Sequence, residues 1–531
     1  MSDQAPWVIV GGGPAAAATA KALVSAGRRP LVLDTGLQLE PEREAARRRM
    51  AATARASWSP ADLALSRYSA AGASVAAYKR LFGSDVAFRD DGVVELTAEP
   101  DVGARPSYAS GGLSNVWGAG VMPYGDRELE GWPIASGDLA AASAAVLDFI
   151  PYAAEEDELA QRYPLIVKPD GPLLRSAAGE AVLARLRTHA DALARAGFRF
   201  GASRLAVRVG HPAPENGCVY ARHCLEGCPY GHIYNAAQTI EQLRRDGLID
   251  YRPGLHVEQL REHDGEVVIE AARLDGSPRV SLQGSRVFLA AGALSSTFIL
   301  QRSALLPERS EILDSQTLYV PFLWAGRKGA TGLEPGHTLA QAFLVLDTPE
   351  VCAHPVHISL YTYNEGLGER ARAGHPALSR LLGPMLDAST RQLVIGICFF
   401  HSDDSHRIIS ACAPGRPSVH LAAARNEASP AILRGFKRAL ARSLAPLGLV
   451  PLLPLAEAPP PGGGFHYGGS VPMRARPGAG ESDTLGRPAS AERIHVVDAA
   501  CFPSVPGGTV TFPAMANAYR IATSVALQDG S

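Results

Sequence analysis

The order of apolar and polar positions is clearest at the N-terminus. The apolar run Trp7–Val10 is bounded by glycine and predicts a short buried strand. The alanine-rich residues 14–26 favour a helix, and Gly27 stands where that helix would stop. The apolar run Leu31–Leu33 predicts a second buried strand. The segment is therefore predicted to be a strand–turn–helix–strand unit.

Three apolar runs in the second half of the chain are strand-like, and turn-rich and helical stretches separate them. They are LAQAFLVLD, HISLYTY and QLVIGICFF. The later stretch SPAILRGFKRALARSLAPLG has apolar residues at roughly helical spacing and predicts an amphipathic helix. We interpret all four as core packing. The proline-rich PLLPLAEAPPPGGG (451–464) is interpreted as a connector between domains.

At 531 residues the chain is too long for one small core, which predicts two domains or one large domain with a second built into it. Lys plus Arg number 51 and Asp plus Glu number 53, for a net charge of -2. The sequence contains no block of like charge, so it predicts neither a nucleic-acid partner nor binding to an anionic membrane surface. The basic stretch EREAARRRM has helical spacing and is interpreted as a solvated helix face.

Targeting segments are not visible in the sequence. No apolar run approaches the ~20 residues that a membrane-spanning helix needs. The N-terminal MSDQAPW has neither the basic region nor the removable apolar stretch of a signal peptide. The sequence therefore predicts no membrane segment and a cytoplasmic location, and it leaves export with a partner subunit open.

The turn between the first strand and the helix has the pattern Gly11-x-Gly13-x-x-Ala16. Gly11 permits the tight turn, Gly13 lets the backbone approach a pyrophosphate, and Ala16 allows close packing of helix on strand. The helix N-terminus would face the pyrophosphate with free N–H groups. Asp34, at the end of the second strand, is placed to accept hydrogen bonds from a ribose. The unit predicts dinucleotide binding and does not separate NAD from FAD.

Four further segments, in this order, resemble the glucose–methanol–choline (GMC) family of flavin oxidoreductases. The first is similar to the family's second flavin loop, and the second to the strand–turn–helix that passes the adenine side of FAD. The third resembles the family's His-x-x-Gly-Thr-x-x-Met, with Ser470 in place of Thr, and the fourth its closing Val-Asp-Ala-Ser pattern. The segments are YASGGLSNVWGAGVMPYGDRELEGWP, RVFLAAGALSSTFIL, FHYGGSVPM and IHVVDAACFPSVPGGTVTFPAMANAYRIA.

The resemblance implies an α/β fold with FAD in a discontinuous Rossmann-like domain of residues 1–140, 200–312 and 462–531. It also implies an inserted α+β substrate domain of residues 141–199 and 313–461, built on an antiparallel sheet. The residues that it places at the cofactor are Gly11, Gly13, Pro14, Ala15, Ala16, Asp34, Gly112, Ser114, Asn115, Val257, Ala291, Gly292, Asp498 and Val510.

The resemblance also implies a reaction. In the family, an alcohol loses its hydroxyl proton to a base while its hydride goes to flavin N5, and the match assigns the base to His466. The family's second polar residue, His or Asn, corresponds to Thr509 here. Threonine can make a hydrogen bond but cannot act as a base near pH 7. The expected substrate is a small-molecule alcohol, sugar or polyol.

Other functions on related folds stay open at this point. They are a lyase that uses the flavin structurally, a flavin monooxygenase or halogenase, and a flavoprotein without catalysis. Bleaching of the flavin by a substrate without oxygen would exclude the lyase, and a requirement for NAD(P)H would indicate the monooxygenase.

Three of the seven cysteines, Cys218, Cys224 and Cys228, lie within eleven residues. They could hold a [3Fe-4S] cluster, bind zinc with His223 or His232, or pack as thiols. The segment resembles the Cys-x-x-x-Cys-Pro-x-Gly stretch of bacterial FAD-dependent glucose dehydrogenases, which carry such a cluster. This implies a dehydrogenase that passes electrons to an outside acceptor, such as a redox partner protein. The scattered cysteines are interpreted as buried thiols: Cys352, Cys398, Cys412 and Cys501.

We predict that the FAD is bound noncovalently. Some family members carry a histidine bonded to the flavin just before the tryptophan of the second loop, and Val116 stands there in this chain. Valine has no nucleophile, so acid precipitation should release yellow flavin into the supernatant. Flavin that stays with the pellet would contradict the prediction.

Overall fold

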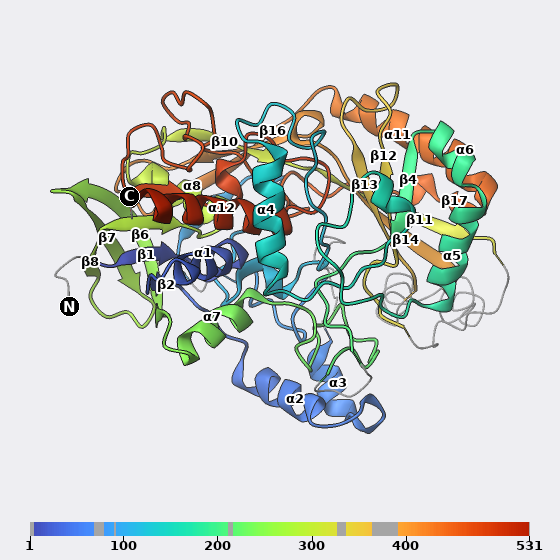
Figure 1. The fold of residues 1–531 in the computed structure, drawn as a ribbon, viewed down its shortest axis with the longest axis horizontal. Helices are drawn as coiled ribbons and strands as arrows, with labels where there is room; N and C mark the ends of the chain where they lie inside the picture. Colours follow the sequence, from blue (N-terminus) through green and yellow to red (C-terminus); the bar gives the residue numbers. More distant parts are fainter. Residues whose placement is uncertain are drawn as a thin grey trace.

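A five-stranded parallel sheet contains the predicted N-terminal unit (Figure 1). The structure, a computed structural model, describes residues 5–67, 79–89, 92–210, 216–326, 336–363 and 391–529. The sheet has the order β19–β9–β1–β2–β5, with Val8 opposite both Leu31 and Val287. The central strands are buried and apolar throughout, as strands covered on both faces must be. The bounds are Trp7–Val10 (β1), Leu31–Leu33 (β2), Asp250–Arg252 (β5), Arg286–Leu289 (β9) and Ile494–Val496 (β19).

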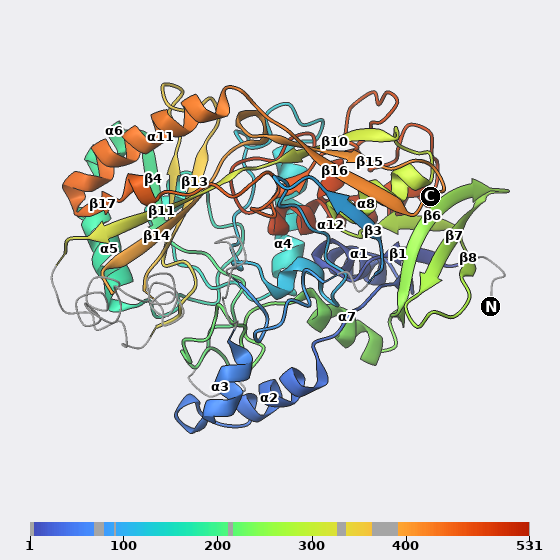
Figure 2. The ribbon, with the colours of Figure 1, turned by 180° about the vertical axis from the view of Figure 1, so that it is seen from behind.

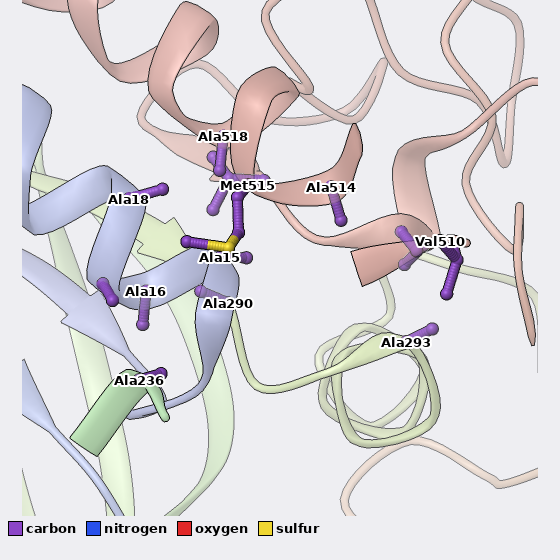
Figure 3. Packing of buried hydrophobic residues seen from close by; sticks show 14 of the residues in the cluster. Ala15, Ala16, Ala18, Ala236, Ala290, Ala293, Val510, Ala514, Met515 and Ala518 are labelled. Atoms are coloured by element: carbon purple, nitrogen blue, oxygen red, sulfur yellow. The ribbon is translucent and has the colours of Figure 1, made fainter. Parts of the chain in front are cut away.

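Helix α1 (Pro14–Ser25) packs along the C-terminal helix α12 (Thr511–Asp529). Alanines line the α1 side of this contact, and Figure 3 shows Met515 of α12 reaching toward them. Ala16 is fully buried, so any larger side chain there would push the helix away from its neighbours. The close packing that the glycine fingerprint predicts is therefore present.

A six-stranded antiparallel sheet, β17–β11–β14–β13–β12–β4, occupies the other end of the molecule (Figure 2). Helices α5, α6 and α11 cover one face, where Phe322 and Val394 share a core with Phe436. The three strand-like runs predicted from the sequence are β12, β13 and β14. The bounds are Phe198–Ala202 (β4), Thr317–Trp324 (β11), Ala342–Leu346 (β12), Val356–Tyr361 (β13), Leu393–Phe399 (β14), Leu449–Pro451 (β17), Ala177–Thr188 (α5), Ala190–Arg195 (α6) and Ser429–Leu444 (α11).

Two further sheets lie among the described residues. In the mixed sheet β18–β10–β15–β16–β3, β16 pairs with β3, although the predicted boundaries assign these strands to different domains. The domain division therefore stays a proposal. The other sheet is the antiparallel meander β6–β7–β8. The bounds are Glu95–Ala98 (β3), Leu255–His263 (β6), Glu266–Arg273 (β7), Val280–Gly284 (β8), Arg309–Asp314 (β10), Arg407–Ala411 (β15), Ser418–Ala424 (β16) and Tyr467–Gly468 (β18).

The basic stretch EREAARRRM lies on α2, where Arg47 and Arg48 pair with Glu44 at 2.7 and 2.8 Å. Helices α2 and α3 project from the rest of the fold (Figure 1). In the ranges that the structure describes, no helix is long and apolar enough to cross a membrane. The remaining α-helices are Pro41–Ala51 (α2), Pro60–Ser66 (α3), Ser136–Leu147 (α4), Ala236–Arg245 (α7) and Ala293–Arg302 (α8).

Candidate functional site

A cavity of about 1250 Å³ lies between the parallel sheet and the uncovered face of the antiparallel sheet. Val10, Leu33 and Ala290, at the carboxyl ends of β1, β2 and β9, line one side of it. Dinucleotides bind outside these strand ends in open α/β sheets. Most of the residues predicted from the sequence line this cavity: Gly11, Gly13, Pro14, Ala15, Asp34, Gly112, Val257, Ala291, Gly292, His466, Asp498, Thr509 and Val510.

The β1–α1 turn has the shape of a phosphate cradle. Gly11 has a φ of 113°, and a Cβ atom there would overlap the carbonyl oxygen of Ala290. A Cβ atom on Gly13 would meet nothing within 4 Å. No side chain caps the N-terminus of α1, so its first N–H groups are available to an anion. The turn therefore fits the pyrophosphate of FAD.

Asp34 ends β2 at the edge of the same cavity. Burial raises the pKa of its carboxyl to about 6, and hydrogen bonds from Tyr251 and nearby backbone N–H groups oppose that rise. The Tyr251 hydroxyl donates to Oδ2 at 3.0 Å. A carboxylate has acceptor sites for several donors, so Asp34 can also accept hydrogen bonds from ribose hydroxyls.

Asp498 shapes the turn before α8. Its Oδ2 accepts hydrogen bonds from the Gly292 N–H at 2.9 Å and the Ser296 hydroxyl at 2.5 Å, and its Oδ1 accepts one from the Ala500 N–H. Burial raises its pKa to about 6. Since the carboxylate holds two backbone segments together, its role here is to position the cavity wall.

The His466 side chain lies between the two sides of the cavity. Its ring stacks on Phe399 of the antiparallel sheet, with centroids 4.5 Å apart and 13° between the planes. Its carbonyl oxygen accepts a hydrogen bond from the Ser315 N–H at 2.8 Å. Burial lowers the pKa of His466 to about 4, and the Gly508 backbone partly opposes this. The imidazole is therefore neutral near pH 7.

Nδ1 of His466 is buried and has no hydrogen-bond partner among the described residues, and the His466 side chain lines the cavity. Thr509, next to Gly508, lines the same cavity, and its Oγ1 has no hydrogen-bond partner. A neutral imidazole nitrogen and a hydroxyl thus stand together where an alcohol could enter.

Three predicted cofactor residues do not line the cavity. Ala16 packs inside the helix layer. The Ser114 hydroxyl accepts a hydrogen bond from the Ala236 N–H, and Asn115 binds Asn235 at 2.6 Å, so both fix the loop to the start of α7. The glycines after His466, Gly468 and Gly469, allow close approach to protein atoms.

Sequence reasoning missed Lys79 as a cavity residue. Its ammonium donates to the Trp117 carbonyl oxygen, and burial lowers its pKa to about 8. The lysine stands in no motif, so no local signal marks it. The uncovered face of the antiparallel sheet was also missed, although the alternation along β14 (Leu393, Ile395, Ile397, Phe399) could have shown it.

Comparisons with known proteins address the fold. No family model and no curated protein matches the chain. Among solved structures, pyridoxine 4-oxidase from Mesorbium loti, a GMC oxidoreductase, matches with a TM-score of 0.58 and 15% identity, over 98% of this chain and 99% of that chain. The chain has the GMC oxidoreductase fold. The α/β fold class predicted from the sequence is confirmed.

Within the GMC fold, the cysteine segment lies beside the cavity. Leu225, between Cys224 and Glu226, lines it. All three cysteines are free thiols, and burial together with the other two cysteines raises the pKa of Cys218 to about 12. The scattered cysteines, by contrast, are buried, as predicted: Cys352, Cys398, Cys412 and Cys501.

A second cluster of candidate ligands lies outside the cavity. Among the described residues, ligand atoms of His354, His401 and Asp403 lie within 4.8 Å of one another. The two imidazoles stack with centroids 3.8 Å apart and only 13° between their planes. A metal ion lies in the plane of each imidazole that binds it. Because these two rings are stacked and nearly parallel, no position close to both rings lies in both planes. We therefore describe this cluster as an ion-paired histidine stack.

We predict that Gly13→Val removes FAD and leaves the apoprotein folded. Gly13 has an ordinary φ of -83° and free space around its Cβ position, so valine fits the fold but fills the cradle. Flavin absorbance per chain should fall to background while the apoprotein melts near the wild-type temperature. Gly11→Ala is the control for a change that strains the turn itself, and it should lower the melting temperature of the apoprotein. Wild-type flavin content in Gly13→Val would contradict the prediction that the FAD pyrophosphate binds at the β1–α1 turn.

Proposed function

We propose that the protein oxidises the CH–OH group of a small-molecule alcohol with bound FAD, and that His466 is the base. The observation that carries the proposal is the neutral His466 imidazole, which lines the same cavity as Thr509 and the phosphate cradle. The GMC fold supports it, because the structural neighbour is named as an oxidase of an alcohol, pyridoxine.

The residues of this chain have distinct roles in the proposed reaction. Because the His466 imidazole is neutral near pH 7, one ring nitrogen carries no proton and can accept the hydroxyl proton. The Thr509 hydroxyl orients the substrate oxygen, and the Phe399 ring holds the plane of the imidazole. Bound FAD supplies a two-electron acceptor at N5. The alcohol leaves as an aldehyde or ketone after losing one proton and one hydride.

We expect His466→Ala to slow anaerobic flavin reduction by ~100-fold or more with FAD still bound, the range for losing a general base. Thr509→Val should raise the activation free energy of flavin reduction by about 1 kcal/mol, since it deletes one hydrogen bond to the substrate.

Because the pKa of His466 lies at about 4, the base is neutral above that pH. The wild-type rate should therefore stay level above about pH 6 and fall as His466 gains a proton near its pKa.

Stopped-flow reduction with a panel of alcohols measures these rates. Near-wild-type reduction by His466→Ala would remove this residue from the mechanism. If no alcohol bleaches the flavin without oxygen, the oxidoreductase proposal itself is wrong, and a lyase or non-catalytic flavoprotein takes its place.

The electron acceptor is a separate part of the proposal. The structural neighbour is an oxidase, which makes oxygen one candidate. The cysteine segment favours the other candidate, a dehydrogenase in which a [3Fe-4S] cluster relays electrons to a partner protein. The cysteine segment lies beside the cavity, which supports such a relay. Tyr220 and Arg222 in this segment have left-handed backbone conformations. These also support it, because strained backbone clusters at functional sites.

If the cluster is present, anaerobically purified protein should contain ~3 iron atoms per chain. A triple Cys→Ser variant at 218, 224 and 228 should lose the iron and the transfer of electrons to dyes, while flavin reduction by substrate persists. Cys412→Ser, a buried thiol outside the segment, is the control. Iron well below one atom per chain with dye-linked activity intact in the triple variant would exclude the relay and leave a packing role.

A further inference from the structure

The uncovered face of the six-stranded sheet forms the wall of the cavity opposite the cofactor cradle. Along β14, Val394 and Cys398 point into the helix-covered core, while Leu393, Ile395 and Ile397 point into the cavity. The neighbouring strands alternate in the same way. The side chains on the cavity side are therefore mostly aliphatic and aromatic, with Tyr319 and Tyr361 among them.

Apart from Glu457, the polar groups of the described part of this wall are the hydroxyls of four residues, Tyr319, Ser359, Tyr361 and Thr362. The Thr362 hydroxyl is already engaged with that of Ser176 at 2.9 Å. The Ser359 hydroxyl hydrogen-bonds to Nε2 of His357 at 2.9 Å. Of the described residues that line the sheet side, Glu457 alone carries a charge, and it is exposed. Asn, Gln and Arg are absent from the described cavity lining. A sugar or polyol needs a partner for each buried hydroxyl, because an unpaired one costs free energy.

We infer that the substrate is an alcohol carried on an apolar ring, aryl or alicyclic, and not a sugar or polyol. This inference rests on the proposed function. One hydroxyl meets His466 and Thr509, and the ring lies against the aliphatic side chains of β14 and the aromatic side chains of Phe343 and Phe399. Aromatic and aliphatic walls with few polar groups are typical of sites that bind such rings.

The test compares benzyl alcohol with sorbitol on the oxidised holoenzyme, by calorimetric binding and by anaerobic flavin reduction. Benzyl alcohol should bind on the order of 100-fold more tightly than sorbitol. Ile395→Asn should raise the Kd for benzyl alcohol about tenfold with flavin content unchanged, and Ile395→Leu should restore the Kd. Val450→Asn, at a 37%-exposed position on the same sheet outside the cavity lining, should change nothing.

The two readouts separate this inference from the function on which it rests. Tight binding of benzyl alcohol that Ile395→Asn weakens, without flavin reduction, would support the apolar site and overturn the oxidoreductase proposal. Reduction by sorbitol in preference to benzyl alcohol would support the oxidoreductase and overturn the apolar substrate. Failure of benzyl alcohol to bind would also overturn the inference.

Discussion

The close approach between the β1–α1 turn and the end of β9 is the constraint on which the site depends. Gly11 lies so near the Ala290 carbonyl that no side chain fits between them. This contact aims the N-terminus of α1 into the cavity, and the alanines of α1 then let α12 pack against the helix. Because α12 follows directly on Thr509 and Val510, one backbone contact helps to place both the cradle and these two cavity residues.

His466 depends on a second set of contacts that join the two sides of the molecule. The Ser315 N–H holds its carbonyl, and β18 pairs with β10 directly after it. Phe399 stacks on the ring from the antiparallel sheet. The side chain is thus held by both halves of the fold, so its ring cannot turn without disturbing one of them. Such support would hold the imidazole in a fixed geometry, as the proposed role of His466 requires.

The parts predicted correctly are those whose signal is local. The β1–α1–β2 unit follows from apolar runs, two glycines and an acid within 28 residues, and the structure reproduces it. The antiparallel sheet was predicted through a family resemblance, and the six strands β17–β11–β14–β13–β12–β4 form it. Ser114 and Asn115 are predicted at the cofactor from a local motif, and the structure adds partners about 120 residues later, at the start of α7. Lys79 enters the cavity only through tertiary packing, which no local pattern encodes.

The strand order of the parallel sheet has a consequence for biosynthesis. Strand β9 lies between β1, near the N-terminus, and β19, which begins at Ile494. At ~5–20 residues per second, ribosomes need on the order of 25–100 s to make the chain between β1 and β19. Until then, one edge of β9 and the binding surface for α12 on α1 stay uncovered. The wall of the cavity is therefore complete only late in synthesis, and apolar surface of the nascent chain stays exposed in the meantime.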